Sequence, residues 1–412
     1  MKKTPPRGMS DMMPADMALR DAVQGAIIAT YRDFGYQRIS TPIVEDAENL
    51  EKSEGGDNLN LIFQVMKRGD KLDEAIKDGD QLWDLGLRYD LTLPLTRFYA
   101  NNHTKLPMPF KVIQTDRVYR AERPQKGRLR EFVQCDIDII GDGNPRAEAE
   151  LIAVTSQALL KVGFSGFTVR INDRRILNAL FAGLGFPVEQ IPPALISFDK
   201  LDKIGMDGVC DDLTAKGMPS NATEALRSFM KNDDLLAALP SFTGELPEVS
   251  DMALLIDELK EVGGQNWNVL FDLSLVRGMG YYTGPVFEIV SDDFEGSIAG
   301  GGRYDNMIEK FTGIATPAVG FSIGFERIIS ILMERNYRPP AQKPALALLY
   351  EEQDDFVKVF GQVQELTGTY LVTALPLNTS SPGRQRARLE RDGFRFVKRM
   401  SEEVSELGVI TT

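Results

Sequence analysis

The stretch from Tyr119 to Asp138, YRAERPQKGRLREFVQCDID, has the pattern of a β-hairpin. Its middle, PQKG, combines proline, glycine and a basic residue, a composition typical of a chain reversal. Beyond this turn, polar and apolar side chains alternate. The apolar set predicts one buried face of a strand and consists of Leu129, Val133, Cys135, Ile137 and Ile139.

The opposite face of the same predicted strand is polar and graded along its length. In order it carries Arg128, Arg130, Phe132, Gln134, Asp136 and Asp138. Arginine binds phosphate through its planar fork, whereas a carboxylate binds an ammonium or an imidazole. The face therefore predicts an elongated ligand with an anionic end and a cationic end. The alternative is a structural ladder of ion pairs between neighbouring strands.

The sequence of this hairpin, RAERPQKGRLREF, resembles the ATP-binding motif of class II aminoacyl-tRNA synthetases, and specifically that of the histidyl-tRNA synthetase family. The resemblance covers nearly the whole chain and is faint after Pro344. It implies an α/β protein (an α+β catalytic core) in which an antiparallel sheet is flanked by helices, with a helical insertion and a small C-terminal α/β domain. The expected bounds are 1–166 and 268–336 for the core, 167–267 for the insertion, 337–343 for a linker and 344–412 for the last domain.

Composition is that of an ordinary globular protein: 412 residues, 43% hydrophobic and 26% charged. Membrane-length apolar runs and a signal-peptide pattern are both missing from the sequence, so we expect a cytoplasmic protein without a membrane partner. A single histidine and two distant cysteines argue against a His-based catalytic triad, a thiolate zinc site or a disulfide framework. The net charge of −13 argues against a large nucleic-acid footprint but permits a local basic patch.

Residues 275–290, LVRGMGYYTGPVFEIV, and 297–305, SIAGGGRYD, form a second informative block. Three successive glycines in a predicted strand suit a ligand that approaches the backbone closely. The sequence contains neither a dinucleotide-binding glycine fingerprint nor a GxxxxGK[ST] phosphate loop. Both stretches are similar to the two histidine-specific motifs of the family. That similarity places Arg277 at the reacting carboxylate and α-phosphate, and tyrosines around the side-chain pocket.

One residue departs from the family pattern. Where these synthetases usually have an aspartate before the tyrosine pair, this chain has Gly280. The change removes a carboxylate beside the expected pocket.

Residues 87–102, LRYDLTLPLTRFYANN, predict a half-buried strand in which Arg88, Asp90 and Thr92 alternate with apolar residues, followed by a helix from Pro94. The stretch is similar to the amino-acid-binding strand of the family, which implies that Asp90 and Thr92 contact a substrate amino group. Alternatively, the two residues cap the helix.

Residues 316–335, TPAVGFSIGFERIISILMER, predict a strand, a turn and a helix. Arg327 is a cation in this apolar stretch, and a buried arginine needs a partner. The stretch resembles the third class II motif, whose arginine contacts ATP phosphate.

The resemblance implies ATP-dependent activation of L-histidine, with Mg²⁺ carried on the ATP and no metal ligand from the protein, followed by transfer to tRNA(His). The residues implied in catalysis are Arg120, Arg277 and Arg327. Those implied in ATP binding are Arg120, Glu122, Arg128 and Arg327. Those implied in histidine binding are Asp90, Thr92, Gln134, Asp138, Tyr281, Tyr282 and Tyr304.

Three alternatives stay open at this point. The segment from Tyr36 to Glu45, interrupted by Pro42, is either an ordinary edge strand or part of a homodimer interface, as in the family resembled. A related non-charging protein serves as the regulatory subunit of ATP phosphoribosyltransferase and binds its catalytic subunit. Acidity, Gly280 and the short C-terminal domain favour that function, whereas the retained phosphate-binding arginines oppose it. A third function is amino-acid activation with an acceptor other than tRNA.

The C-terminal segment also contains the densest basic cluster of the chain. It consists of Arg384, Arg386, Arg388, Arg391, Arg395, Lys398 and Arg399. The cluster suits RNA phosphate as well as it suits a solvated helix face.

Overall fold

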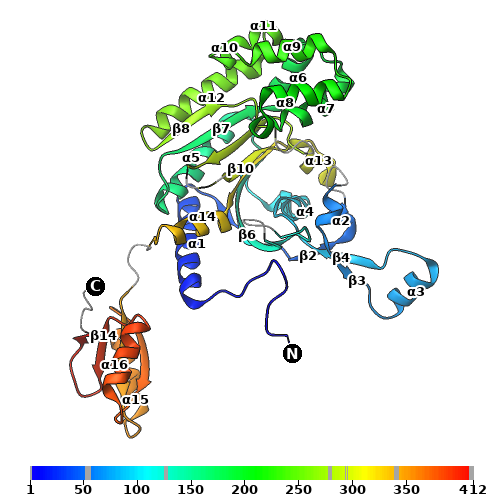
Figure 1. Cartoon of the computed structure of the whole chain (residues 1–412). Coiled ribbons are helices and arrows are strands. Elements are labelled where there is room, and N and C mark those ends of the chain that lie inside the picture. The colour runs from blue at the N-terminus through cyan, green and yellow to red at the C-terminus, as the bar shows by residue number, and fades with distance from the viewer. Residues whose placement is uncertain are drawn as a thin grey trace. The chain divides into compact units, whose positions relative to one another are not determined.

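The computed structural model describes residues 2–51, 57–124, 129–276, 281–292, 294, 296–337 and 343–407. The chain forms two compact units, Met1–Tyr337 and Arg338–Thr412 (Figure 1). Within the described part, none of the helices has the length and apolar character needed to cross a membrane.

An eight-stranded sheet organises the first unit, with strand order β1-β5-β6-β11-β10-β9-β7-β8. Its strands are β1 (Gln37–Arg38), β5 (Phe110–Tyr119), β6 (Glu131–Ile140), β7 (Phe167–Asp173), β8 (Trp267–Phe271), β9 (Pro285–Val290), β10 (Ser297–Arg303) and β11 (Ala318–Gly324). All pairs from β5 to β7 are antiparallel, and only the outermost pairs, β1 with β5 and β7 with β8, are parallel. The hairpin predicted from the sequence is confirmed as β5 and β6.

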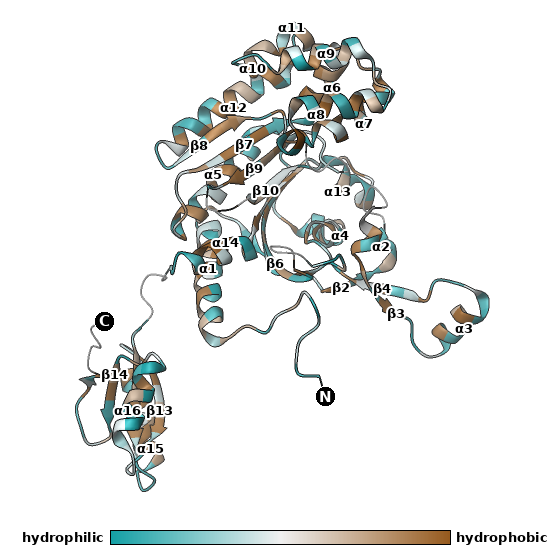
Figure 2. Ribbon diagram, viewed as in Figure 1, coloured by the Kyte–Doolittle hydropathy of each residue, from teal (hydrophilic) through white to brown (hydrophobic). Residues whose placement is uncertain are grey.

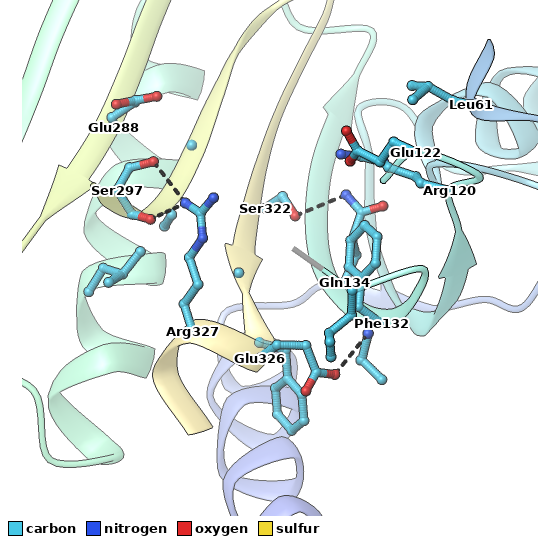
Figure 3. Close-up of a pocket in the computed structure, with 17 residues that line it drawn as sticks. Leu61, Arg120, Glu122, Phe132, Gln134, Glu288, Ser297, Ser322, Glu326 and Arg327 are labelled. Carbon is cyan, nitrogen blue, oxygen red and sulfur yellow. Dashed lines mark hydrogen bonds between the residues drawn. The ribbon is translucent and has the colours of Figure 1, made fainter. Parts of the chain in front are cut away.

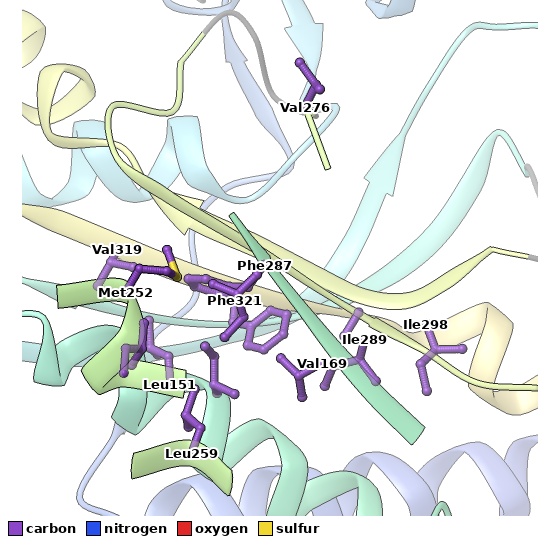
Figure 4. Close-up of a cluster of buried hydrophobic side chains, with 14 of the residues drawn as sticks. Leu151, Val169, Met252, Leu259, Val276, Phe287, Ile289, Ile298, Val319 and Phe321 are labelled. Carbon is purple, nitrogen blue, oxygen red and sulfur yellow. The ribbon is translucent and has the colours of Figure 1, made fainter. Parts of the chain in front are cut away.

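One face of this sheet is covered by α1 (Pro14–Asp33), α5 (Arg146–Lys161) and α12 (Pro247–Gly263). The buried side chains between them form the main hydrophobic core, which includes Leu151, Met252, Phe287 and Phe321 (Figure 4). Cys135, Ile137 and Ile139 of β6 belong to this core, as their alternation predicts.

The other face of the sheet carries α4 (Thr92–Asn102), η2 (His103–Lys105) and α13 (Asp305–Thr312). Val112, Ile140 and Leu95 pack together there in a smaller cluster. Gln134, Asp136 and Asp138 share this face with Ile140, because they are separated from it by even numbers of residues. Helix α14 (Phe325–Glu334) follows β11 directly and contacts β6 and β10.

A three-stranded sheet of β2 (Val44–Asp46), β4 (Trp83–Leu87) and β3 (Phe63–Met66) lies beside α4. Its other elements are α2 (Ala47–Glu51), η1 (Asp57–Leu61) and α3 (Asp70–Asp78), and Figure 1 shows α3 projecting at the end of β3 and β4. The strand predicted from residue 87 up to a helix start at Pro94 ends at Leu87, and α4 begins at Thr92. The chain turns there into α4, where Asp90 accepts from the Leu93 N–H. The fully buried Arg88 donates from its side chain to the carbonyl oxygens of Thr41, at 2.8 Å, and Arg117, at 2.9 Å.

Between β7 and β8 the chain is helical, with α6 (Arg174–Gly183), η3 (Val188–Gln190), α7 (Ile191–Phe198), α8 (Leu201–Ala215), α9 (Ser220–Phe229), α10 (Leu235–Ala238), α11 (Pro240–Thr243) and α12. The first seven residues of the range expected to be an insertion, Phe167–Asp173, instead form β7 of the large sheet. The buried Phe167, Val169 and Ile171 alternate along β7 and belong to the core, which is why the segment is a sheet strand.

The second unit is a four-stranded sheet of order β13-β12-β14-β15 with two helices. Its elements are β12 (Ala345–Tyr350), α15 (Phe356–Leu366), β13 (Leu371–Pro376), α16 (Pro382–Arg391), β14 (Phe396–Arg399) and β15 (Ser405–Glu406). Strands and helices alternate from β12 to β14, as expected for the small C-terminal α/β domain that the resemblance implies. Figure 2 shows α16 mostly in teal, in line with its exposed arginines.

Candidate active site

Two adjoining cavities lie over the polar face of the large sheet, with volumes of about 400 Å³ and about 370 Å³. We call the first the arginine cavity and the second the aspartate cavity. Both are lined by Leu61, Arg120, Gln134, Glu288, Gly300 and Ser322. These shared residues lie at the boundary of the cavities, so an elongated ligand can occupy both.

The arginine cavity has a guanidinium on either side, Arg120 after β5 and Arg327 on α14 (Figure 3). Arg120 donates from Nε to the Tyr89 carbonyl oxygen at 3.0 Å, and its guanidinium lies 5.0 Å from the centre of the Phe132 ring. Arg327 donates to the Ser297 carbonyl oxygen and, at 3.3 Å, to Ser297 Oγ. The partner that the sequence requires for Arg327 is therefore found in β10.

The hairpin face does not present all of its predicted cations to this cavity. Arg130 donates from Nε to the Glu122 carbonyl oxygen at 3.0 Å and from Nη2 to that of Ala121 at 3.1 Å. Its guanidinium thus ties the two arms of the hairpin together. Arg128 lies outside the described residues, and so do Arg277 and Gly280.

The aspartate cavity is lined by Asp90, Thr92, Asp136 and Asp138. Asp136 and Asp138 are 5% and 4% exposed. The backbone N–H of Leu93, in the first turn of α4, donates to Asp90 Oδ1 at 3.2 Å, and Asp90 also borders the cavity. The carboxylate therefore binds the helix start, while contact of Asp90 and Thr92 with a substrate amino group stays a prediction.

The surroundings of these carboxyl groups in the cavity disfavour their ionised forms. Burial raises the pKa of Asp138 to about 7, although the hydrogen bond from Tyr304 acts in the opposite direction. Burial and the charge of Asp138 raise the pKa of Asp136, and burial raises that of Asp90. Because a cation in the cavity would favour all three ionised forms, the cavity suits a positively charged ligand.

Tyrosines and glycines shape the aspartate cavity. Tyr281 and Tyr282 line it, with ring centres 4.2 Å apart. Tyr304 is 2% exposed and donates from its hydroxyl to Asp138 Oδ1 at 2.6 Å, so it holds a lining residue from behind. A Cβ on Gly302 would lie 2.9 Å from Cδ1 of Tyr282, which shows why this strand position excludes a side chain.

Sequence reasoning gave no role to Glu288 or Ser322, which line both cavities, or to Ser297 in the arginine cavity. Two signals were present. Glu288 is the single charge in the apolar stretch PVFEIV, and Ser322 is the polar residue midway between Gly320 and Gly324.

A family model described as histidyl-tRNA synthetase matches residues 8–328. The histidine–tRNA ligase of Leifsonia xyli subsp. xyli (strain CTCB07) is 45% identical over 350 residues, which cover 80% of this chain and 80% of that protein. A probable histidine–tRNA ligase of Tropheryma whipplei (strain Twist) is 38% identical over 410 residues, which cover 96% of this chain and 95% of that protein.

Two solved structures are similar over almost the whole chain. The crystal structure of histidyl-tRNA synthetase from Nostoc sp. PCC 7120 has a TM-score of 0.79 and 28% identity, covering 96% of this chain and 91% of that one. A structure titled ATP phosphoribosyltransferase regulatory subunit/histidyl-tRNA synthetase, from Bacillus halodurans C, has a TM-score of 0.79 and 22% identity, covering 97% and 98%. At that identity the second match establishes the fold alone. With the family model matched over residues 8–328 and 45% identity to a relative across 80% of its length, the chain belongs to the histidyl-tRNA synthetase family.

Proposed function

We propose that this protein joins L-histidine to ATP, releasing pyrophosphate, and then transfers the histidyl group to the 3′ end of tRNA(His). The observation that carries the proposal is the pair of adjoining cavities, one bordered by guanidiniums and the other by the buried carboxyl groups of Asp136 and Asp138 together with the half-buried Asp90. Histidine adenylate needs this combination, because its phosphate is anionic while its ammonium and imidazole groups are cationic or donate N–H groups.

ATP would occupy the arginine cavity, with its phosphates between Arg120 and Arg327. Both side chains border the cavity, and Phe132 adds an aromatic surface. Glu122 and Glu288 also line it. Although the resemblance implies no metal ligand from the protein, we add these two carboxylates to the proposal, because carboxylate oxygens suit the Mg²⁺ that ATP carries. Mg²⁺ supplies charge neutralisation on the phosphates. Arg128 belongs to this set by its place in the motif.

Histidine would occupy the aspartate cavity. Its ammonium would lie near Asp90, Thr92 and Gln134, which line that cavity. Its imidazole would lie against Asp138, which Tyr304 holds in place, with the tyrosines Tyr281 and Tyr282 beside it. Arg120 borders both cavities, so the histidine carboxylate and the α-phosphate would meet beside its guanidinium.

In this reaction a carboxylate oxygen attacks the α-phosphorus as the bond to pyrophosphate breaks. The two reacting groups are both anions, so positioning and charge neutralisation are the main contributions of the site. Arg120, Arg327 and, from its motif, Arg277 would supply that neutralisation. In the second step a ribose hydroxyl of tRNA attacks the acyl carbon and AMP leaves, which requires no protein nucleophile.

The proposal includes a cytoplasmic homodimer. The edge strand β1 pairs with β5 and leaves Gln37 and Arg38 exposed, and α1 lies on the same part of the sheet. Contact with tRNA would involve the exposed arginines of α16. No observation on the described residues specifically favours the regulatory-subunit function or an acceptor other than tRNA.

The deciding experiment is histidine-dependent exchange of labelled pyrophosphate into ATP by the full-length protein without tRNA. We expect robust exchange with histidine and none with other amino acids. A folded protein that binds histidine without exchange would refute the activation step. If exchange occurs, charging of a tRNA(His) transcript then tests the acceptor.

A further inference from the structure

Three side chains on neighbouring strands form a hydrogen-bonded chain between the two cavities. Ser322 Oγ donates to Asp136 Oδ1, and Gln134 Nε2 donates to Ser322 Oγ at 3.4 Å. Gln134 and Asp136 lie on β6, and Ser322 lies on β11 directly opposite Asp136 in the antiparallel register. We call this the serine relay.

Which groups of the serine relay donate and which accept follows from the number of protons that they carry. An ionised carboxylate accepts hydrogen bonds and has none to donate, whereas a serine hydroxyl has one proton. Since Ser322 gives its proton to Asp136, it can only accept from Gln134, and the glutamine side chain donates only through its amide nitrogen. Figure 3 shows the amide nitrogen of Gln134 turned to Ser322 and the amide oxygen turned away from it.

In this arrangement the amide oxygen of Gln134 does not take part in the relay, and it is buried. Among the described residues, Gln134 Oε1 has no hydrogen-bond partner, and Gln134 lines both cavities. A buried carbonyl oxygen without a donor is unfavourable, so a ligand that brings an N–H group to this point is favoured. A ligand that brings another acceptor would be repelled.

On this face of β11, Ser322 carries the side chain that can bridge Gln134 and Asp136. Gly320 and Gly324 lie two residues to either side on the same strand face. A Cβ on Gly320 would lie 2.0 Å from Asp138 Oδ1, so a larger residue there would displace that carboxylate. The hydroxyl of Ser322 thus stands between two positions without side chains.

We propose that Ser322 and Asp136 are positioning residues that hold the Gln134 amide with its oxygen toward the cavities, and so select a ligand with a cationic N–H donor, an ammonium group, at that point. The inference rests on the proposed function, in which that ligand is L-histidine. It adds the determinant that distinguishes the amino acid from an imidazole compound without an ammonium group.

The charges around Asp136 connect the ligand to the direction of the relay. Asp138, Asp90 and Arg120 all act on this carboxyl group, and burial together with Asp138 raises its pKa. A protonated Asp136 would donate to Ser322, and Ser322 would then donate to Gln134, which reverses the amide. A bound cation favours the ionised form of Asp136 and therefore the orientation that accepts from the cation.

The test compares two ligands on the full-length protein by calorimetry: L-histidine and 3-(imidazol-4-yl)propionate, which lacks the ammonium group. For Ser322→Ala we expect histidine binding to weaken roughly tenfold, because a hydrogen bond to a charged donor is lost. Binding of the propionate and the KM for ATP should stay within about twofold of wild type, a difference comparable to a few tenths of a kcal/mol. Ser322→Thr, which keeps the hydroxyl, should restore histidine binding. Ser330→Ala on the exposed side of α14 is the matched control and should leave histidine binding at the wild-type level.

Asp136→Asn distinguishes the relay from simple charge attraction. An asparagine amide can donate to Ser322 and reverse the relay, so the single variant and the double variant with Ser322→Ala should weaken histidine binding to a similar extent. If the fold-losses in histidine affinity of the two single variants multiply in the double variant, Asp136 acts by charge alone, and the proposal is overturned. Equal losses for histidine and the propionate in Ser322→Ala, or no loss at all, would also overturn it.

The same experiment separates this inference from the proposed function. If wild type binds histidine but shows no pyrophosphate exchange, the proposed function fails, while the comparison of the two ligands still decides the role of the relay. If wild type does not bind histidine, both fail.

Discussion

At the scale of single residues, burial of the Asp138 carboxyl group in the aspartate cavity lowers the stability of the ligand-free protein. Asp138 is almost completely buried and receives a hydrogen bond from Tyr304. Its pKa nevertheless rises to about 7, because burial disfavours the charged carboxylate. In the unfolded chain an aspartate loses its proton near pH 4. The folded protein therefore binds an extra proton between these values, and its stability falls as the pH rises through this window.

Replacing Asp138 with asparagine removes this penalty and keeps an acceptor for the Tyr304 hydroxyl. We expect Asp138→Asn to raise the melting temperature of the ligand-free protein by several degrees at pH 8 and by less at pH 5. Thermal unfolding at the two pH values measures the effect. Asp211→Asn, which removes an exposed carboxylate from α8, is the control. An equal gain at both pH values would mean that the carboxyl group is not the cause.

A second residue-scale prediction concerns Arg277. The family motif places its guanidinium at the reacting carboxylate and α-phosphate, where it would neutralise charge that develops during the reaction. Arg277→Ala should therefore abolish pyrophosphate exchange while ATP binding stays measurable by calorimetry. Unchanged turnover would remove Arg277 from the mechanism.

At the scale of elements, the β5–β6 hairpin is held by a segment from the N-terminus. The backbone N–H of Arg130 donates to the Gly8 carbonyl oxygen at 2.8 Å, while its side chain bridges to the other arm of the hairpin. Gly8 has a φ of +84°, and a Cβ there would lie 2.9 Å from Cγ of Arg130 and from Cγ of Pro124. The hairpin carries Arg120 and Glu122, so this contact positions one side of the arginine cavity.

We expect Gly8→Ala to detach the N-terminal segment from the hairpin, because both the backbone conformation and the space exclude a methyl group. The KM for ATP should rise several-fold and that for histidine should change less. Steady-state exchange kinetics measure both. Gly25→Ala is a matched control: it lies within α1 with no atom within 4 Å of the added Cβ, and it should leave both values unchanged while slightly stabilising the helix. Equal rises in the two KM values would contradict a specific role for the N-terminal segment.

At the scale of the whole molecule, the chain divides at Tyr337 into two units with separate hydrophobic cores. Every described residue that lines either cavity belongs to the first unit. The exposed arginines of α16 belong to the second. The proposed activation and the proposed RNA contact therefore fall in different units.

Deleting residues 338–412 should leave pyrophosphate exchange close to that of the full chain and lower charging of tRNA(His) by roughly tenfold or more, because cationic contacts to phosphate are lost. Exchange and aminoacylation assays on the same preparation measure the two effects. Equal losses in both would show that the second unit stabilises the first and does not act through RNA.

Much of the fold was predictable from local patterns. The hairpin and the strand and helix around Arg327 were both predicted, because turn residues and apolar periodicity act over a few neighbours. The strand predicted through Asp90 was wrong: β4 ends at Leu87, and α4 begins at Thr92 with Asp90 accepting from the Leu93 N–H. The buried Arg88 binds the carbonyl oxygens of Thr41 and Arg117, which lie on segments distant in sequence, so the local pattern carried no sign of these contacts.

By itself the sequence determined where polar and apolar residues alternate, where the chain turns and which family the chain belongs to, since each of these depends on short contiguous stretches. Only the tertiary structure decided that Arg130 binds the hairpin rather than a ligand, that Tyr304 stands behind Asp138, and that Ser322 lies opposite Asp136. Ser322 and Asp136 are 186 residues apart, and the order in which strands assemble brings them together. That order follows from burial of whole strand faces against helices, a property of the complete chain rather than of any one segment.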